Sequence, residues 1–154
     1  MRIAIASDHA AVAMKAELVE WLTGMGHEVA DLGPDGDASV DYPDYGYKLA
    51  DTVASGEADR GIALCGSGVG ISIAVNRNPA VRCALVSEPL SAQLSREHND
   101  ANIIAMGARL IGPEMARMCL EAFLTTEFAG GRHQRRVDKL STPQTSKESS
   151  RQTA

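Results

Sequence analysis

The sequence predicts an α/β fold, a three-layer αβα sandwich built on a five-stranded parallel sheet. Short runs of small and β-branched apolar residues alternate with longer stretches of helical periodicity almost throughout the chain, which indicates βαβ units. Right-handed crossovers between parallel strands then place helices on both faces of the sheet. The 154 residues, of which 44% are hydrophobic and 23% charged, suit a single globular domain.

The first half of the chain alternates strands with helices. The opening apolar run RIAIAS has the composition of a buried strand, and the apolar residues after it recur at helical spacing until Gly24 and Gly26 end the helix. A Gly/Asp-rich loop precedes the next helix, which Gly56 ends. In chain order we expect a strand at 2–7, a helix at 12–23, a strand at 28–32, a loop at 33–41, a helix at 45–55 and a strand at 60–65.

The second half repeats this order after a glycine-rich turn. The turn, Gly66-Ser67-Gly68-Val69-Gly70, leads into a helix that ends near Asn76, and Pro89 opens the following helix. The remaining elements are a strand at 81–87, a helix at 89–98, a strand at 102–106 and a helix at 113–126. Such an order is typical of Rossmann-like and flavodoxin-like folds, whose ligands bind at the carboxyl ends of the strands.

Charge divides the chain unevenly. Lys and Arg number 15 and Asp and Glu number 20, a net charge of −5. Residues 1–131 hold 9 basic and 18 acidic side chains (net −9), whereas residues 132–154 hold 6 and 2 (net +4). We predict one domain over residues 1–141 that includes a basic C-terminal arm at 132–140. Residues 142–154 have no large apolar side chain, so we expect a disordered tail there.

Composition excludes several classes of function. The acidic total and an aromatic content of 4% argue against a nucleic-acid partner. No apolar stretch approaches the roughly 20 residues of a membrane span and no signal peptide is visible, so we expect a cytoplasmic protein without a membrane partner. The dispersed cysteines Cys65, Cys83 and Cys119 fit neither a disulfide framework nor a zinc site, and we expect no metal.

The sequence CGSGVG follows a predicted strand and opens a predicted helix. Its glycines let a ligand approach the backbone, and a helix N-terminus offers free N–H groups. It is neither a dinucleotide fingerprint, because the third glycine comes one residue early, nor a P-loop, because it has no Lys. Ile71 stands where a cysteine phosphatase loop needs Arg. The motif therefore predicts an oxyanion or anion cradle beside a thiol.

Cys65 at this position can act as a thiolate base or nucleophile. The alternative is that it is a small buried hydrophobe at the end of a strand, as free cysteines often are. The adjoining glycine loop favours the functional interpretation for Cys65, whereas Cys83 and Cys119 are expected in the core.

Other candidates are histidines and arginines. His9 follows Asp8 directly after the first strand, and His98 lies at a helix end, where it can also simply cap the helix. Arg132 and Arg136 are spaced to share one helical face, and arginine binds phosphate through paired N–H donors. The alternative for this basic cluster is a solvated surface.

Together these motifs resemble the sugar-phosphate isomerase family that includes ribose-5-phosphate isomerase B, galactose-6-phosphate isomerase subunits and an allose-6-phosphate isomerase. The resemblance spans residues 1–140. The motifs that carry it are Ser7-Asp8-His9-Ala10, Asp41-Tyr42-Pro43, Cys65-Gly66-Ser67-Gly68-Val69-Gly70-Ile71-Ser72, Ser87-Glu88-Pro89, His98-Asn99-Asp100-Ala101-Asn102 and Gly130-Gly131-Arg132-His133.

The resemblance implies an enzyme of the pentose phosphate pathway that needs no metal or cofactor and interconverts D-ribose 5-phosphate and D-ribulose 5-phosphate through a cis-enediolate. It implies Cys65 as the base, His98 as the residue that assists ring opening, and Ser67 as a further catalytic residue. It also implies a homodimer or a tetramer whose sites use residues of two subunits. The substrate-binding residues would be Asp8, His9, Tyr42, Gly66, Ser67, Gly68, Val69, Gly70, Asn99, Arg109, Arg132 and Arg136.

Two alternatives stay open. After Asp8-His9-Ala10 the family usually has Gly and a bulky apolar residue, whereas this chain has Ala11 and Val12, which affects the pocket wall and the size of the sugar. The first alternative is therefore an isomerase of a six-carbon aldose phosphate, allose 6-phosphate or galactose 6-phosphate. The second is a non-catalytic sensor of a phosphate ligand on a flavodoxin-like sheet, which Cys65 disfavours because it stands where a receiver domain has its acceptor Asp.

Overall fold

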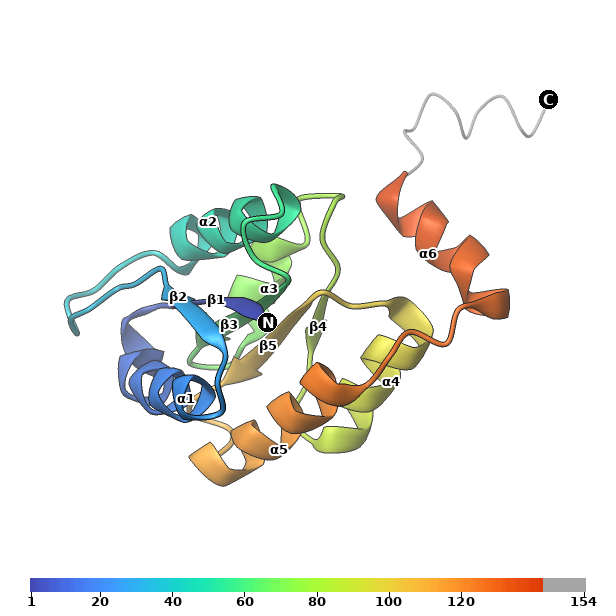
Figure 1. Ribbon diagram of the computed structural model, residues 1–154. Coiled ribbons are helices and arrows are strands. Elements are labelled where there is room, and N and C mark those ends of the chain that lie inside the picture. The colour runs from blue at the N-terminus through green and yellow to red at the C-terminus, as the bar shows by residue number, and fades with distance from the viewer. Residues whose placement is uncertain (143–154) are drawn as a thin grey trace.

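The computed structural model describes residues 1–142, so the predicted tail lies outside the described residues from residue 143 onward. The predicted fold class is confirmed. All strand pairs are parallel, and they form a five-stranded sheet in the order β2-β1-β3-β5-β4 (Figure 1). The strands are β1 (Arg2–Ser7), β2 (Glu28–Asp31), β3 (Arg60–Cys65), β4 (Cys83–Leu85) and β5 (Ile103–Gly107).

Helices cover both faces of the sheet. Helices α1, α4 and α5 lie on one face and α2 and α3 on the other (Figure 1). A short 3₁₀ helix, η1, links β1 to α1, and a second, η2, precedes α6. The helices are η1 (His9–Ala11), α1 (Val12–Gly24), α2 (Tyr42–Ala54), α3 (Val69–Val75), α4 (Pro89–Asn99), α5 (Pro113–Thr125), η2 (Gly131–His133) and α6 (Gln134–Ser141). Within residues 1–142 no helix is long and apolar enough to cross a membrane.

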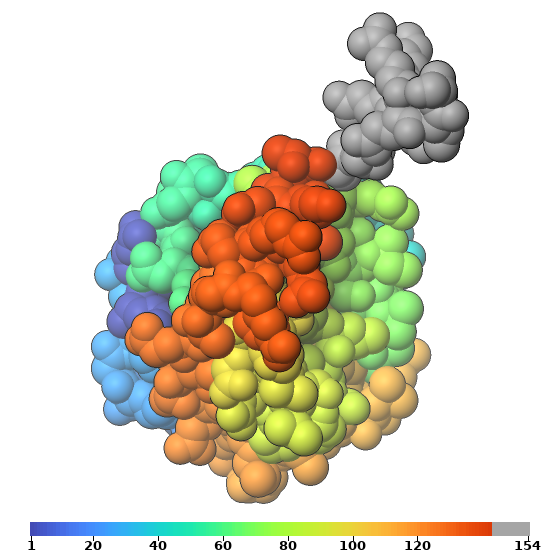
Figure 2. Space-filling view, turned by 90° about the vertical axis from the view of Figure 1, so that its right-hand side faces the viewer, coloured from blue at the N-terminus to red at the C-terminus, as the bar shows by residue number. Residues whose placement is uncertain are grey.

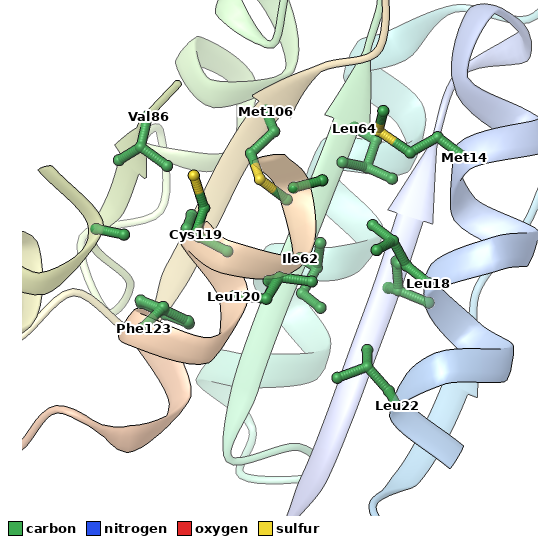
Figure 3. Close-up of a cluster of buried hydrophobic side chains, with 14 of the residues drawn as sticks. Met14, Leu18, Leu22, Ile62, Leu64, Val86, Met106, Cys119, Leu120 and Phe123 are labelled. Atoms are coloured by element: carbon green, nitrogen blue, oxygen red, sulfur yellow. The ribbon is translucent and has the colours of Figure 1, made fainter. Parts of the chain in front are cut away.

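Each face of the sheet has its own hydrophobic core, because alternate strand residues point to opposite faces. The larger core includes Leu18 of α1, Leu120 and Phe123 of α5, and Ile62 and Leu64 of β3 (Figure 3). The smaller core lies under α2 and α3, and small strand residues dominate it. Cys65 belongs to this second core, so its side chain lies on the α3 side of the sheet.

Two elements differ from their predicted bounds by two or more residues at an end, and the others agree to within one residue. Helix α2 begins at Tyr42, three residues before the predicted start, because Pro43 in its first turn favours helix initiation. Strand β4 spans Cys83–Leu85, not the predicted 81–87. It is an edge strand, and the side-chain amide of Asn76 accepts from the Cys83 N–H and donates to the Cys83 carbonyl, both at 2.9 Å.

The predicted basic arm is a helix for most of its length. Gly130 and Gly131 have φ angles of 63° and 55°, and they turn the chain between α5 and α6. Val137 is the one buried residue of α6, which lies as a ridge on the surface above α4 (Figure 2).

Candidate functional site

The strand order reverses between β1 and β3, since β1 leads outward to β2 and β3 lies on the other side with β5 and β4. Such a switch point opens a crevice at the carboxyl ends of the two strands, where ligands of open α/β sheets bind. Asp8 follows β1 there and Cys65 ends β3. A cavity of about 270 Å³ opens between them, and its lining residues are Asp8, Tyr42, Cys65, Gly66, Ser67, Gly70, Arg109 and Leu110.

Backbone geometry holds the Cys65 thiol in this cavity. The backbone N–H of Gly68 donates to the Cys65 sulfur at 3.1 Å, and an N–H aimed at sulfur stabilises negative charge there. Pairing between β3 and β5 continues past the strand ends, because the N–H groups of Ala108 and Arg109 donate to the carbonyls of Cys65 and Gly66. Cys65 and Arg109 are therefore fixed side by side.

The turn after Cys65 requires glycine at two positions. Gly68 has a φ of 77°, and a Cβ there would lie 2.8 Å from the backbone carbon of Met106. A Cβ on Gly70 would lie 2.6 Å from the Tyr42 ring. Tyr42 thus packs directly on the turn and forms one wall of the cavity. The hydroxyl of Ser67 accepts from the Val69 N–H at 3.2 Å, which closes the turn from inside.

Arg109 forms the opposite wall. Its guanidinium lies over Gly66, where a Cβ would be 3.3 Å from an arginine nitrogen. None of the salt bridges within residues 1–142 involves Arg109, and the side chain is exposed. The cavity therefore presents a guanidinium to an anionic ligand.

Asp8 and His9 approach the same edge from η1. The Asp8 carboxylate accepts from the Ala10 N–H at 2.9 Å, which caps η1. The Nδ1 atom of His9 accepts from the Val40 N–H at 3.2 Å. The same Nδ1 lies 3.3 Å from the Val40 carbonyl oxygen, so the tautomer of His9 decides which of the two Val40 groups it bonds.

The remaining predicted residues gather at the opposite edge of the sheet. Helix α4 runs from the carboxyl end of β4 back to the amino end of β5, so His98 and Asn99 in its last turn lie at the amino edge. The His98 ring stacks on that of His133, with centroids 4.4 Å apart and planes at 16°. Partial desolvation, followed by the charges of His98, Arg132 and Arg136, lowers the pKa of His133.

These two groups of residues do not meet within one chain. Ile103 pairs with Gly61 at the amino end of β5, and Gly107 pairs with Cys65 at its carboxyl end. Four residue steps separate the two ends of β5, about 13 Å at roughly 3.3 Å per residue. His98, Asn99, Arg132 and Arg136 therefore lie at least a strand's length from the Cys65 cavity of the same chain.

Other candidates have structural roles. The Glu88 carboxylate accepts from the N–H groups of Leu90 and Ser91, which caps α4 and lowers the pKa of Glu88. Burial raises the pKa of Cys83 to about 12 and that of Cys119 to about 11, so both are neutral thiols near pH 7. In the part of the chain that the structure describes, no three His, Cys, Asp or Glu side chains are grouped to hold a metal ion.

Leu110 is the lining residue that the sequence did not indicate. It is 68% exposed and lies at the mouth of the cavity next to Arg109. In the sequence, Leu110 was indicated as a lining residue only by its position in the loop that follows β5. With a thiol, backbone N–H groups and a guanidinium in one crevice, the site has the groups needed to remove a proton beside a carbonyl and to stabilise the resulting oxyanion.

Comparison with known proteins identifies similar chains. A family model described as Ribose/Galactose Isomerase matches residues 3–140. The chain is 47% identical over 139 residues to ribose-5-phosphate isomerase B of Escherichia coli (strain K12), which covers 90% of this chain and 93% of that protein. A solved ribose-5-phosphate isomerase B of Clostridium thermocellum superposes with a TM-score of 0.91 at 48% identity, covering 92% of this chain and 96% of the other. The enzyme of Mycoplasma genitalium, solved with bound ribulose-5-phosphate, gives a TM-score of 0.88 at 39% identity, with 92% and 94% covered.

Proposed function

Because the chain belongs to the ribose/galactose isomerase family, we propose that it is an aldose–ketose isomerase that interconverts D-ribose 5-phosphate and D-ribulose 5-phosphate. The single observation that carries this proposal is the cavity at the switch point, where Cys65 receives an N–H from Gly68 and lies beside Arg109. The names of the E. coli relative and of the M. genitalium complex support the choice of a pentose phosphate.

Cys65 is the proposed base. The thiolate takes the proton from C2 of the open-chain aldose, the electron pair of that C–H bond forms the C1–C2 double bond, and O1 takes the negative charge. Return of the proton to C1, with transfer of the O2 hydroxyl proton to O1, gives the ketone at C2 and the alcohol at C1. N–H groups of the 66–70 turn other than those of Gly68 and Val69, which bond Cys65 and Ser67, hold the enediolate oxygen, a role that can contribute several kcal/mol.

Ribose 5-phosphate is mainly a furanose and must open before C2 can lose its proton. In opening, the bond between C1 and the ring oxygen breaks, the C1 hydroxyl loses a proton and the ring oxygen gains one. His98 is the proposed acid–base residue for this step, and Arg109, Arg132 and Arg136 are the proposed phosphate ligands. The phosphate supplies binding energy remote from the reacting carbons, which positions them.

His98 can act at Cys65 only if it comes from a second copy of the chain, and we propose a homodimer on this ground. The edge of the sheet at β4 is flanked by α3 and α4 (Figure 1). Exposed apolar side chains lie on these three elements, namely Val69 and Ile73 on α3, Leu85 on β4, and Leu90 and Leu94 on α4. A two-fold axis across this edge sets the amino edge of one copy against the carboxyl edge of the other and so completes two identical sites.

Two measurements test the proposed activity. Steady-state kinetics with ribose 5-phosphate, allose 6-phosphate and galactose 6-phosphate identify the substrate, and a clear preference for a hexose phosphate would refute the pentose assignment. Replacing the base in Cys65→Ala should abolish turnover, with Cys119→Ala as the control in the core. Full activity of Cys65→Ala would refute the base, and no turnover of any sugar phosphate by the wild type would favour a non-catalytic sensor.

A further inference from the structure

Asp100, directly after α4, has an unusual backbone conformation. Its φ of 46° and ψ of 43° are left-handed, and no other non-glycine residue within residues 1–142 has a positive φ. A residue with a Cβ loses free energy in this conformation and keeps it only where its surroundings hold it, although Asp tolerates it better than most. The contacts of the Asp100 side chain show what holds it.

Each carboxylate oxygen of Asp100 pairs with an arginine. Oδ1 accepts from Arg96 at 2.8 Å, and Oδ2 accepts from Arg82 at 3.4 Å. The Nε of Arg82 also donates to the carbonyls of Asn99 at 3.1 Å and Asp100 at 3.0 Å. Arg82 therefore holds the two peptide groups that flank Asp100, and its ion pair with the Asp100 carboxylate ties the side chain to the same turn directly after α4.

Arg96 ties the same turn to the rest of the amino edge. Its side chain is only 4% exposed, and it donates to the Ala101 carbonyl at 2.6 Å and to the Thr126 carbonyl at 3.2 Å. It also lies over the Phe123 ring, 6.0 Å from the centroid. Arg96 thus anchors the start of the segment from Thr126 to His133, and the ring of His133 stacks on that of His98.

The carboxylate of Asp100 also offsets a concentration of positive charge. Burial lowers the pKa of Arg60, and the positive charge of the nearby Arg96 lowers it further. Among the described residues Asp100 is the only carboxylate in an ion pair with Arg82 or Arg96. Glycine would satisfy the left-handed turn without this carboxylate, so replacing Asp100 by glycine removes the charge that faces the two arginines and keeps the backbone conformation.

We propose that Asp100 is a positioning residue of the isomerase, which holds His98 through the ion pairs with Arg82 and Arg96 in the orientation that ring opening requires. The inference rests on the proposed function, in which His98 opens the sugar. Asp100 itself does not contact the sugar in this scheme, and its effect passes through the last turn of α4.

The test is a double-mutant cycle between Asp100→Gly and His98→Ala, measured as kcat/KM for ribose 5-phosphate. Asp100→Gly keeps the left-handed turn and removes the carboxylate. We expect a loss of about 100-fold, the effect of a misplaced catalytic group. The unfolding temperature should fall, because the nearly buried Arg96 loses its carboxylate partner, so kcat/KM is measured well below the unfolding transition. In the His98→Ala background the same replacement should cost less than about threefold, because the residue that it positions is already absent.

Equal losses in both backgrounds would overturn the proposal, because a general structural role multiplies with the loss of His98. Wild-type activity in Asp100→Gly would overturn it as well. If Asp100→Gly does not fold, Asp100→Asn takes its place in the cycle, and it should retain part of the wild-type activity, because its amide oxygen still accepts from an arginine. Glu114→Gln, which breaks the exposed pair with Arg117, is the matched ion-pair control and should change nothing. Absence of wild-type turnover would refute the proposed function itself, and this proposal with it.

Discussion

Subunit complementation tests the shared site most directly. Cys65→Ala removes the proposed base at the carboxyl edge, and His98→Ala removes the proposed ring-opening residue at the amino edge. The two residues lie at least the length of β5 apart in one chain, about 13 Å at roughly 3.3 Å per residue. Each homodimer should therefore keep only a small residual activity, because both of its sites lack one proposed catalytic group.

A mixed dimer of these two variants has one site with both defects and one intact site. If subunits exchange freely in an equal mixture, half of the dimers are mixed and half of their sites are intact, so about a quarter of wild-type activity should return. The assay is the conversion of ribose 5-phosphate before and after subunit exchange, or after co-expression of the two chains with different tags.

The matched control combines Cys65→Ala with Arg109→Ala, whose residues line the same cavity. Every site of that mixed dimer carries one defect, so no activity should return. Failure of the Cys65→Ala and His98→Ala pair to recover activity, in dimers shown to be mixed, would refute the shared site. Recovery by the control pair would refute the assignment of Cys65 and Arg109 of one subunit to the same site.

Three further predictions concern stability. Gly68→Ala should lower the free energy of unfolding by about 1–3 kcal/mol, because an alanine at a φ of 77° would meet the backbone of Met106. The control is Gly24→Ala, whose Cβ meets no other atom and which should be neutral or stabilising. Equal free energies of unfolding for the two variants in denaturant titrations would contradict this geometry. Asp31→Ala should cost about 3–5 kcal/mol, because it leaves the buried Lys15 ammonium, only 3% exposed, without the two carboxylate oxygens that it bonds at 2.6 and 2.7 Å; a change below 1 kcal/mol would show that this pair behaves like a surface one. Hydrogen bonds from Arg2 lower the pKa of Asp59 from 3.8 to about 2, so the pair stabilises the fold above pH 3.8 and loses this effect as the pH falls through 2. The difference in the free energy of unfolding between the wild type and Arg2→Ala should therefore shrink over that interval. A difference that persists at lower pH would refute the linkage.

Much of the fold followed from the sequence because its signals are local. The strand at residues 60–65 was predicted with its observed bounds, since glycine-rich turns and polar residues mark both of its ends. The edge strand β4 was predicted too long, because hydropathy alone does not reveal that the amide of Asn76 engages the backbone of Cys83. The earlier start of α2 depends on Pro43, which lies in the first turn of the helix, where proline is favoured although it breaks helices elsewhere.

The site was predictable to the extent that topology places it. Asp8 and Cys65 follow neighbouring parallel strands, and the structure brings them to one cavity. His98 ends a helix that returns to the amino edge, so its separation from Cys65 was implicit in the strand order. The stacking of His98 on His133 and the contact of His9 with Val40 join residues far apart in sequence, so no local sequence pattern predicts these contacts.

The bond pair between Asn76 and Cys83 bears on how copies of this chain can assemble. An edge strand with free N–H and C=O groups invites another strand to add, and repeated addition leads to open-ended aggregates. At Cys83 a side-chain amide already takes both backbone groups, so an incoming strand finds no ladder there to extend. In the proposed homodimer, contact across this edge would then rely on side chains near Cys83, which favours a closed pair of subunits over a continuous intermolecular sheet.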